Sequence, residues 1–264
     1  MSENKTSVLP DIITPVSDAI HQNLPETEKQ ADGALSTVVG FFNNVVLYPV
    51  KKANLTFRYK LEAFEDDLKE KIMGIPEENL QVPPTMIAGP TLEALRYTYD
   101  EAELREMYEN LLASAMDTRK VSETHPAFVD AIRQMSPLDA RLLSEIADKG
   151  QFRCGEVHFE LIGSTKYYTK AMPNHFVLEL VDFADPFTVS ASLINLERLG
   201  LLKITGGGIQ GESYEGMKTH PYVLQRAEIF KQFGREFEIQ VSKHAVRLNN
   251  FGTQFAKICL AKEL

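Results

Sequence analysis

The chain has 264 residues and a mass of 29.7 kDa; 44% of its residues are hydrophobic and 25% are charged, a balance that is typical of a globular protein and excludes wholesale disorder. The formal net charge is −9: residues 1–120 hold 12 basic and 20 acidic side chains, a net of −8, and residues 121–264 hold 16 and 17, a net of −1. Because neither half is basic, we do not expect this protein to bind nucleic acid mainly through contacts with the phosphates. The two cysteines exclude a disulfide scaffold and a four-cysteine zinc site.

Residues 1–32 are predicted to be a flexible N-terminal arm. Pro10, Pro15 and Pro25 interrupt this segment, and polar side chains are frequent in it. The first ten residues lack a basic stretch followed by an apolar core, so we expect no signal peptide. Together with the low cysteine content, this favours a cytoplasmic protein.

Residues 33–50 form the most apolar stretch of the chain. As a helix it would be about 25 Å long, short of the roughly 30 Å core of a bilayer, and the adjacent Asn43 and Asn44 disfavour insertion. Because Lys51 and Lys52 follow directly, the helix could lie in a membrane surface. The favoured interpretation is nevertheless a helix buried against a core or a second subunit. The candidate membrane or partner contacts are Phe41, Phe42, Val45, Val46, Lys51 and Lys52.

An amphipathic helix is predicted for residues 53–73. Apolar residues recur at helical spacing from Phe57 to Ile72, and Gly74 follows at a position where helices commonly end. The proline-rich stretch 75–90 is predicted to be an extended connector, because proline fixes φ and keeps the preceding residue out of the helical region.

Further helices are predicted over residues 91–117, from Thr124 onward and over 137–149. The first of them is expected to break near Thr98. Taken with the preceding helices, these segments predict a helical core over residues 33–135.

Residues 136–264 are predicted to form a mixed module. Its expected elements in chain order are the helix 137–149, a strand over 152–161, the helix 186–199, a strand over 201–205, a glycine-rich loop over 206–216, a helix over 221–233, a strand within 235–248 and a closing helix. The order is typical of a winged-helix-like module, and the fold class is α+β and predominantly helical. The recognition helix of a DNA-binding protein needs basic or amide groups that point toward the base edges. The helix predicted over residues 186–199 would be the recognition helix here, and it offers only Asn195 and Arg198. We therefore expect an interaction scaffold rather than a DNA reader.

No catalytic signature is found in the sequence. Residues 206–211 match G-x-G-x-x-G in letters, but no amphipathic helix or βαβ unit follows, so we interpret them as a flexible loop tip. Cys154 and His158 are spaced i, i+4, but a zinc site needs about four ligands. The cysteine pair that accompanies H-x-E in zinc deaminases is also missing. We expect no catalytic residue, no cofactor and no metal.

Several short motifs follow one another through the central block. They are Ile75–Leu80, Pro83–Pro84, Ile87–Pro90, Glu103–Glu106, Asn110–Ser114 and His125–Phe128. This succession resembles the Abi-alpha (abortive infection alpha) family. Near the end of the chain, the stretch from Leu248 to Gly252 is similar to the family's closing Leu-Thr-x-Phe-Gly, with Asn249 in place of threonine. The resemblance covers roughly residues 35–264 and implies a bacterial protein of phage defence, without supplying catalytic residues.

The favoured hypothesis is therefore a phage-defence protein that acts through contacts rather than catalysis. The expected partner is another protein or a second copy of the chain, with a membrane surface as a further candidate and nucleic acid not expected. The expected location is the cytoplasm, either free or peripheral to the inner membrane. The alternatives are a winged-helix DNA-binding regulator and an enzyme with a cryptic site.

Overall fold

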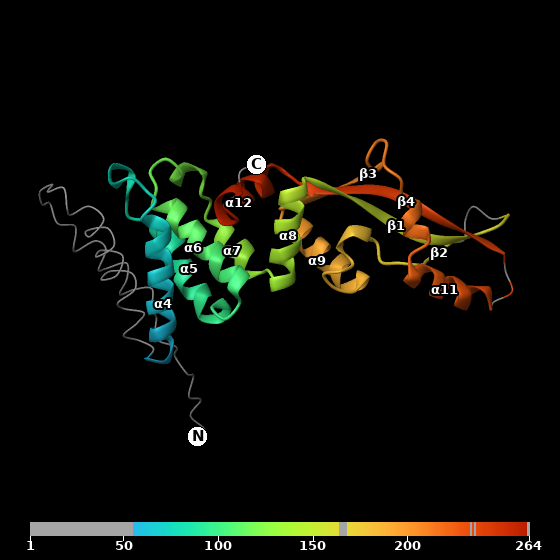
Figure 1. The fold of residues 1–264 in the computed structure, drawn as a ribbon, viewed down its shortest axis with the longest axis horizontal. Coiled ribbons are helices and arrows are strands. Elements are labelled where there is room, and N and C mark those ends of the chain that lie inside the picture. The colour runs from blue at the N-terminus through green and yellow to red at the C-terminus, as the bar shows by residue number, and fades with distance from the viewer. Residues whose placement is uncertain (1–54, 164–167, 233, 235, 263–264) are drawn as a thin grey trace, which may run out of the picture. The chain divides into compact units, whose positions relative to one another are not determined.

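The computed structural model describes residues 55–163, 168–232, 234 and 236–262 (Figure 1). The predicted arm 1–32 and the apolar stretch 33–50 lie outside the described residues. The chain divides into two compact units, Met1–Asp100 with Tyr108–Val129, and Glu101–Met107 with Asp130–Leu264. The proposed domain limits after residues 32 and 135 stay predictions.

The first unit is helical where it is described. Its elements are α4 (Leu55–Ile72), η2 (Glu77–Asn79), α5 (Thr85–Thr98), the second half of α6 (Ala102–Ala115), η3 (Val121–Glu123) and the start of α7 (Ala127–Arg133). Phe64, Leu95 and Tyr108 are fully buried, one from each of the three long helices. Lys60 Nζ lies 2.6 Å from Asp100 Oδ1 and ties α4 to the turn before α6. The amphipathic helix predicted over 53–73 is confirmed.

The predicted extended connector over residues 75–90 is wrong for its last part, because α5 contains Pro90. The preceding Gly89 has no Cβ to collide with the proline ring. The carbonyl left without its helical partner belongs to Met86, a residue that is 67% exposed, so water can reach it. An interior proline costs about 3 kcal/mol, and each buried side chain on the inner face, such as Leu92, contributes about 1.5–3 kcal/mol. Tertiary burial therefore outweighs the local rule.

The second unit places helices around an antiparallel sheet of four strands. Its elements are α8 (Pro137–Lys149), β1 (Gln151–Leu161), β2 (Tyr168–Lys170), η4 (Leu178–Leu180), α9 (Pro186–Arg198), β3 (Leu202–Gly206), α10 (Glu215–Lys218), α11 (Pro221–Lys231), β4 (Phe237–Leu248) and α12 (Asn250–Cys259). The strand order is β2-β1-β4-β3. The long pair β1–β4 runs without a bulge from Gln151↔Arg247 to Leu161↔Phe237. The predicted helices and strands of this half are confirmed in type, and β4 is one continuous strand.

Cap residues set the ends of α8 and α9. Ser136 and Asp139 form the capping box: the Ser136 hydroxyl accepts from Asp139 N, and the Asp139 carboxylate accepts from Ser136 N at 2.7 Å. Gly150 ends α8 at φ 83°, a conformation that glycine adopts readily. Asp185 caps α9 by accepting from the N–H groups of Phe187 and Thr188. The bounds of α8 match the helix predicted over 137–149, and α9 ends one residue before the end of the helix predicted over 186–199.

Two helical layers cover opposite faces of the sheet. Val157 and Phe159 lie on one face and belong to a core cluster with side chains from α10 and α11. Phe152, Cys154 and Val246 lie on the other face, because side chains alternate along a strand; all three are buried, on the side where α8 and α9 contact the strands. Figure 1 shows α8, α9 and α12 at one end of the sheet and α11 at the other. Each layer covers one half of the sheet.

The closing helix is locked against the chain after α9 by Asn249 and Gly252. The Asn249 side chain accepts from Gly252 N at 2.9 Å and donates to Gly200 O and Leu202 O at 2.8 and 3.3 Å. A Cβ on Gly252 would lie 1.9 Å from Leu201 O. Only glycine fits there, which gives a physical reason for the motif near the end of the chain.

The α+β class with a predominance of helix is confirmed. The winged-helix-like assignment of residues 136–264 stays a prediction, because α10 and α11 occupy the connection between β3 and β4 where only a loop and one helix were expected. None of the helices in the described ranges combines the length and the apolar character that crossing a bilayer requires.

Candidate functional site

The contact residues predicted from the sequence are not placed by the structure. Phe41, Phe42, Val45, Val46, Lys51 and Lys52 all lie outside the described residues. Three features of the second unit are candidates for a site: the glycine-rich loop, the surroundings of Cys154, and the outer face of α9.

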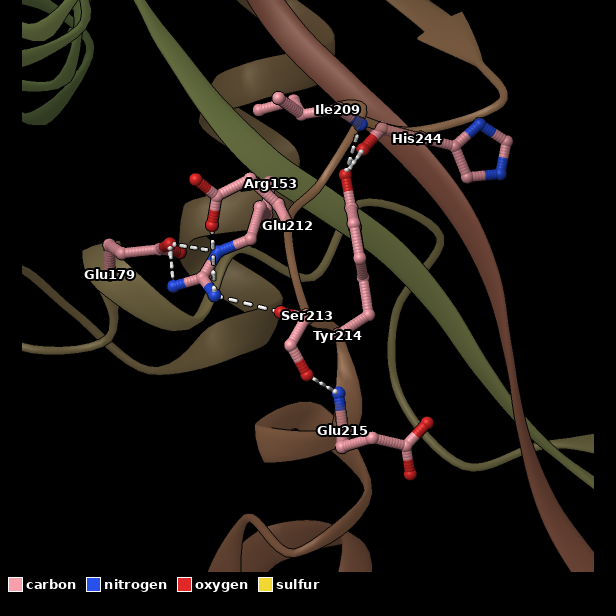
Figure 2. A network of polar contacts seen from close by, with 8 residues as sticks. All are labelled: Arg153, Glu179, Ile209, Glu212, Ser213, Tyr214, Glu215 and His244. Carbon is pink, nitrogen blue, oxygen red and sulfur yellow. Dashed lines mark hydrogen bonds and ion pairs between the residues drawn. The ribbon is translucent and has the colours of Figure 1, made fainter.

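Arg153 on β1 anchors the second half of the glycine-rich loop (Figure 2). Its guanidinium donates to Glu179 Oε1 at 2.7 Å and to Ser213 O at 2.8 Å, and it lies 3.7 Å from Glu212 Oε2. The hydrogen bond with Glu179 raises the pKa of Arg153 above its ordinary value. The Arg153 cation is paired within this cluster, which holds the loop, while Glu179 Oε2 is buried without a hydrogen-bond partner among the described residues.

Tyr214 holds the tip of the same loop. Its hydroxyl donates to His244 O at 2.7 Å and accepts from Ile209 N at 2.9 Å, while the His244 ring points away (Figure 2). Burial raises the pKa of Tyr214. A Cβ on Gly208, which has φ 71°, would lie 3.0 Å from the Tyr214 hydroxyl. The glycines thus allow a tight loop that lies against the sheet. The tip of this loop was predicted to be flexible, and the hydrogen bonds of Tyr214 hold it in place.

Cys154 is poorly suited to nucleophilic chemistry. Its Sγ lies 4.0 Å from His175 Nδ1, which resembles a Cys–His pair in outline. Burial raises the pKa of Cys154 to about 12, with Glu197 and Glu179 adding to the effect, and burial lowers the pKa of His175. A neutral thiol beside a neutral imidazole forms almost no thiolate at neutral pH.

The Cys154–His158 spacing also loses its meaning as a ligand pair. Both residues lie on strand β1, where four residues span about 13 Å, too far for two ligands of one zinc ion. In the part of the chain that the structure describes, no three His, Cys, Asp or Glu side chains are placed to hold a metal ion.

The outer face of α9 carries an exposed apolar stripe. Phe187, Ala191, Ile194 and Arg198 follow at helical spacing and fall within an arc of about 60°. Phe187 is 50% exposed and Ile194 is 46% exposed. We call these four residues the α9 stripe.

The two polar residues that could read bases are engaged inside the module. The Asn195 amide donates to Gln134 O and to Asp139 Oδ2, both at 3.0 Å, and its oxygen accepts from Arg198 at 2.7 Å. Arg198 also donates to Gln134 Oε1. Asn195 therefore braces α9 against the capping box of α8, and its amide is not available to read bases. Arg198 is exposed and donates to the neutral amide oxygens of Asn195 and Gln134.

Helix α11 exposes large apolar residues without forming such a stripe. Tyr222, Leu224 and Ile229 are 44%, 47% and 54% exposed. Leu224 lies on the opposite side of α11, whereas Tyr222 and Ile229, seven residues apart, share a face. The exposed cation Arg226 lies between these two, at the position that the small apolar Ala191 takes in α9. The apolar surface of α9 is therefore the more continuous of the two.

The inward residues of α9 were predicted from the sequence, but its outward residues were not predicted to form a contact surface. The periodicity of α9 predicts Val189, Leu193, Leu196 and Leu199 on the inner face; the first three are buried and Leu199 is half buried. Phe187 and Ile194, seven residues apart, are apolar positions outside that inner face. This leftover spacing is the signal that could have revealed the stripe from the sequence.

The architecture and this surface define an α+β protein with an anchored loop, an unreactive thiol and an apolar helix face. The chain matches the abortive infection alpha family over residues 56–259 and belongs to that family. No curated protein matches the chain. A solved structure of an uncharacterized protein from the marine bacterium Alcanivorax borkumensis SK2 is similar over 53% of this chain and 96% of that one, with 12% identity and a TM-score of 0.34. A likeness at this level carries no argument.

Proposed function

We propose that this abortive infection alpha protein takes part in phage defence by binding another protein chain, and that the α9 stripe is its contact face. The observation that carries the proposal is the pair of half-exposed apolar side chains, Phe187 and Ile194, on one outward stripe. Exposed apolar groups that lie together commonly mark a surface that binds protein.

The charge around the stripe favours protein over nucleic acid as partner. A duplex reader presents cations and free amides toward the groove, whereas this stripe ends in a single cation, Arg198, and begins beside Asp182 and Asp185. The amide of Asn195 is already bonded within the module. We therefore place the DNA-binding regulator second.

The finer architecture of residues 136–264 is proposed to be winged-helix-like. Helices α8 and α9 pack together beside the strands, and three of the strands run in the order β1-β4-β3, with β3 and β4 paired antiparallel. In this interpretation α10 and α11 are an insertion between β3 and β4. The scaffold presents α9 outward, as a winged helix presents its reading helix, but with an apolar face.

The test is protection of bacteria against phage by variants of the stripe. Phe187→Asp and Ile194→Asp are expected to abolish protection while leaving expression and circular dichroism unchanged, because both positions are half exposed. Leu224→Asp on α11 is the matched control, since Leu224 is 47% exposed and lies off the stripe. Full protection by both stripe variants would refute the proposal.

A membrane step is a second candidate, motivated by the apolar stretch 33–50 and the cations Lys51 and Lys52 that follow it. In this proposal the protein lies partly at the inner face of the membrane. Co-sedimentation with anionic vesicles would compare the intact chain with a variant that lacks residues 1–52. We expect only the intact chain to pellet; equal pelleting of both would remove this candidate.

A further inference from the structure

We propose that the partner of the α9 stripe is a second copy of this chain, and that two α9 helices pair antiparallel about a two-fold axis near Ala191. This inference rests on the proposed contact face and names its occupant. A two-fold interface requires a surface that is complementary to itself after half a turn. The stripe meets this requirement in the spacing of its apolar residues and in the opposite charges near its two ends.

The apolar residues of the stripe are arranged symmetrically. Phe187 and Ile194 lie seven residues apart, about 10 Å along the helix axis, and Ala191 lies within half a residue of their midpoint. In an antiparallel pair, Phe187 of one copy therefore faces Ile194 of the other. The small Ala191 on the axis lets the two helices approach to the usual distance of about 8–10 Å.

The charges of the stripe complete the same symmetry. A half-turn about this midpoint brings the C-terminal end of one α9, which carries Arg198, to the N-terminal end of the other, which the exposed Asp182 and Asp185 precede. Asp185 caps its own helix by accepting from the N–H groups of Phe187 and Thr188. Within its own chain Arg198 donates to the amide oxygens of Asn195 and Gln134. Among the described residues, no ion pair joins Arg198, Asp182 or Asp185 to an opposite charge. Each contact would thus supply two pairs of opposite charge between the copies.

The size of the contact sets the expected strength. Four residues from each copy bury far less than the roughly 800 Å² per partner of a standard interface. We therefore expect a dimer that forms with increasing concentration and dissociates on dilution.

Sedimentation equilibrium over a dilution series tests the dimer in the full chain. Ile194→Asp is expected to raise the dissociation constant at least about tenfold, because it places two carboxylates in an apolar contact. Leu224→Asp on α11 is expected to leave the constant unchanged. A wild-type chain that stays monomeric at every concentration, or a dimer that Ile194→Asp does not weaken, would overturn the proposal.

An exchange of charges tests the antiparallel register. Arg198→Glu is expected to weaken the dimer several-fold, because it brings carboxylates together at both ends of the contact. Adding Asp182→Lys to the same chain is expected to restore the dimer, since opposite charges would face each other again with their signs reversed. Failure of the double variant to recover would contradict this register.

A cross-link tests the axis directly. Helix axes about 8–10 Å apart with Cα radii of about 2.3 Å bring facing Cα atoms within about 3.4–5.4 Å, close enough for a disulfide. Ala191→Cys is expected to form a covalent dimer on oxidation, and Leu224→Cys is not. The native Cys154 and Cys259 are both buried and do not compete. If the two copies of residue 191 do not cross-link, the two-fold axis of the dimer does not lie near Ala191.

The outcomes separate this inference from the proposed function. A monomeric protein whose protection against phage still requires Phe187 and Ile194 would retain the contact face and overturn the second copy as its occupant. A dimer that depends on Ile194, combined with full protection by the Ile194→Asp variant, would support the pairing and refute its role in defence.

Discussion

Replacing Gly252 by alanine is expected to destabilise the closing helix strongly. An ideal Cβ at this position lies 1.9 Å from Leu201 O and 2.8 Å from its carbonyl carbon, whereas ordinary contact distances are about 3.5 Å. The obstacle is backbone rather than a flexible side chain, so no rotamer change relieves it. Helix α12 must move away from the chain that leads into β3.

The magnitude follows from what this movement breaks. The Asn249 side chain bonds Gly252 N at 2.9 Å and Gly200 O at 2.8 Å, and losing two such bonds costs about 1 kcal/mol each. Overpacking against a rigid neighbour adds about 1–3 kcal/mol. The gain in helix propensity from glycine to alanine is at most about 1 kcal/mol. We therefore expect a net loss of about 2–4 kcal/mol.

Urea unfolding followed by far-ultraviolet circular dichroism measures this loss, because the chain has no tryptophan to report by fluorescence. Gly206→Ala is the matched control: it lies in β3, and a Cβ added there would meet no atom within 4 Å, so we expect no loss and a gain of up to about 1 kcal/mol. A Gly252→Ala protein as stable as the wild type would refute the reasoning about this contact.

Three further measurements check the polar and titratable groups. Tyr214→Phe is expected to cost about 1–2 kcal/mol of unfolding free energy, and the Ile209 amide, which loses its acceptor, should exchange hydrogen faster; an unchanged exchange rate would contradict the anchored loop. Cys154 and Cys259 are expected to resist a thiol reagent at pH 8 in the folded protein and to react after denaturation, because burial raises the pKa of Cys154 to about 12 and that of Cys259 well above its usual range. Burial lowers the pKa of His220, so the unfolded chain takes up protons first as the pH falls through about 6.5. Stability should therefore decrease toward about pH 5.5, and a His220→Phe variant should show a smaller decrease.

The helices of this protein were largely predictable because their boundaries are local. Ser136 with Asp139, Asp185 before proline, and Gly150 each act within one turn of the chain. The exception is Pro90: rules based on neighbours in the sequence indicate an extended chain, and the burial of the inner face of α5 overrules them.

The candidate site was less predictable, because exposure is a property of the assembled structure. The sequence shows Asn195 and Arg198 as polar groups on α9, but only the fold directs the Asn195 amide to Gln134 O and Asp139. The separation of Cys154 and His158 was, in contrast, predictable: the sequence predicts a strand over residues 152–161, and β1 (Gln151–Leu161) confirms it.

The sequence by itself determined the family, the α+β class and most helix ends, because periodicity, caps and short motifs are written in neighbouring residues. Only the tertiary structure decided the strand order β2-β1-β4-β3, the halves of the sheet that each helical layer covers, and the outward direction of Phe187 and Ile194. These depend on which distant segments meet. Whether a side chain is exposed, and can therefore contact a partner, depends on how the rest of the chain folds around it.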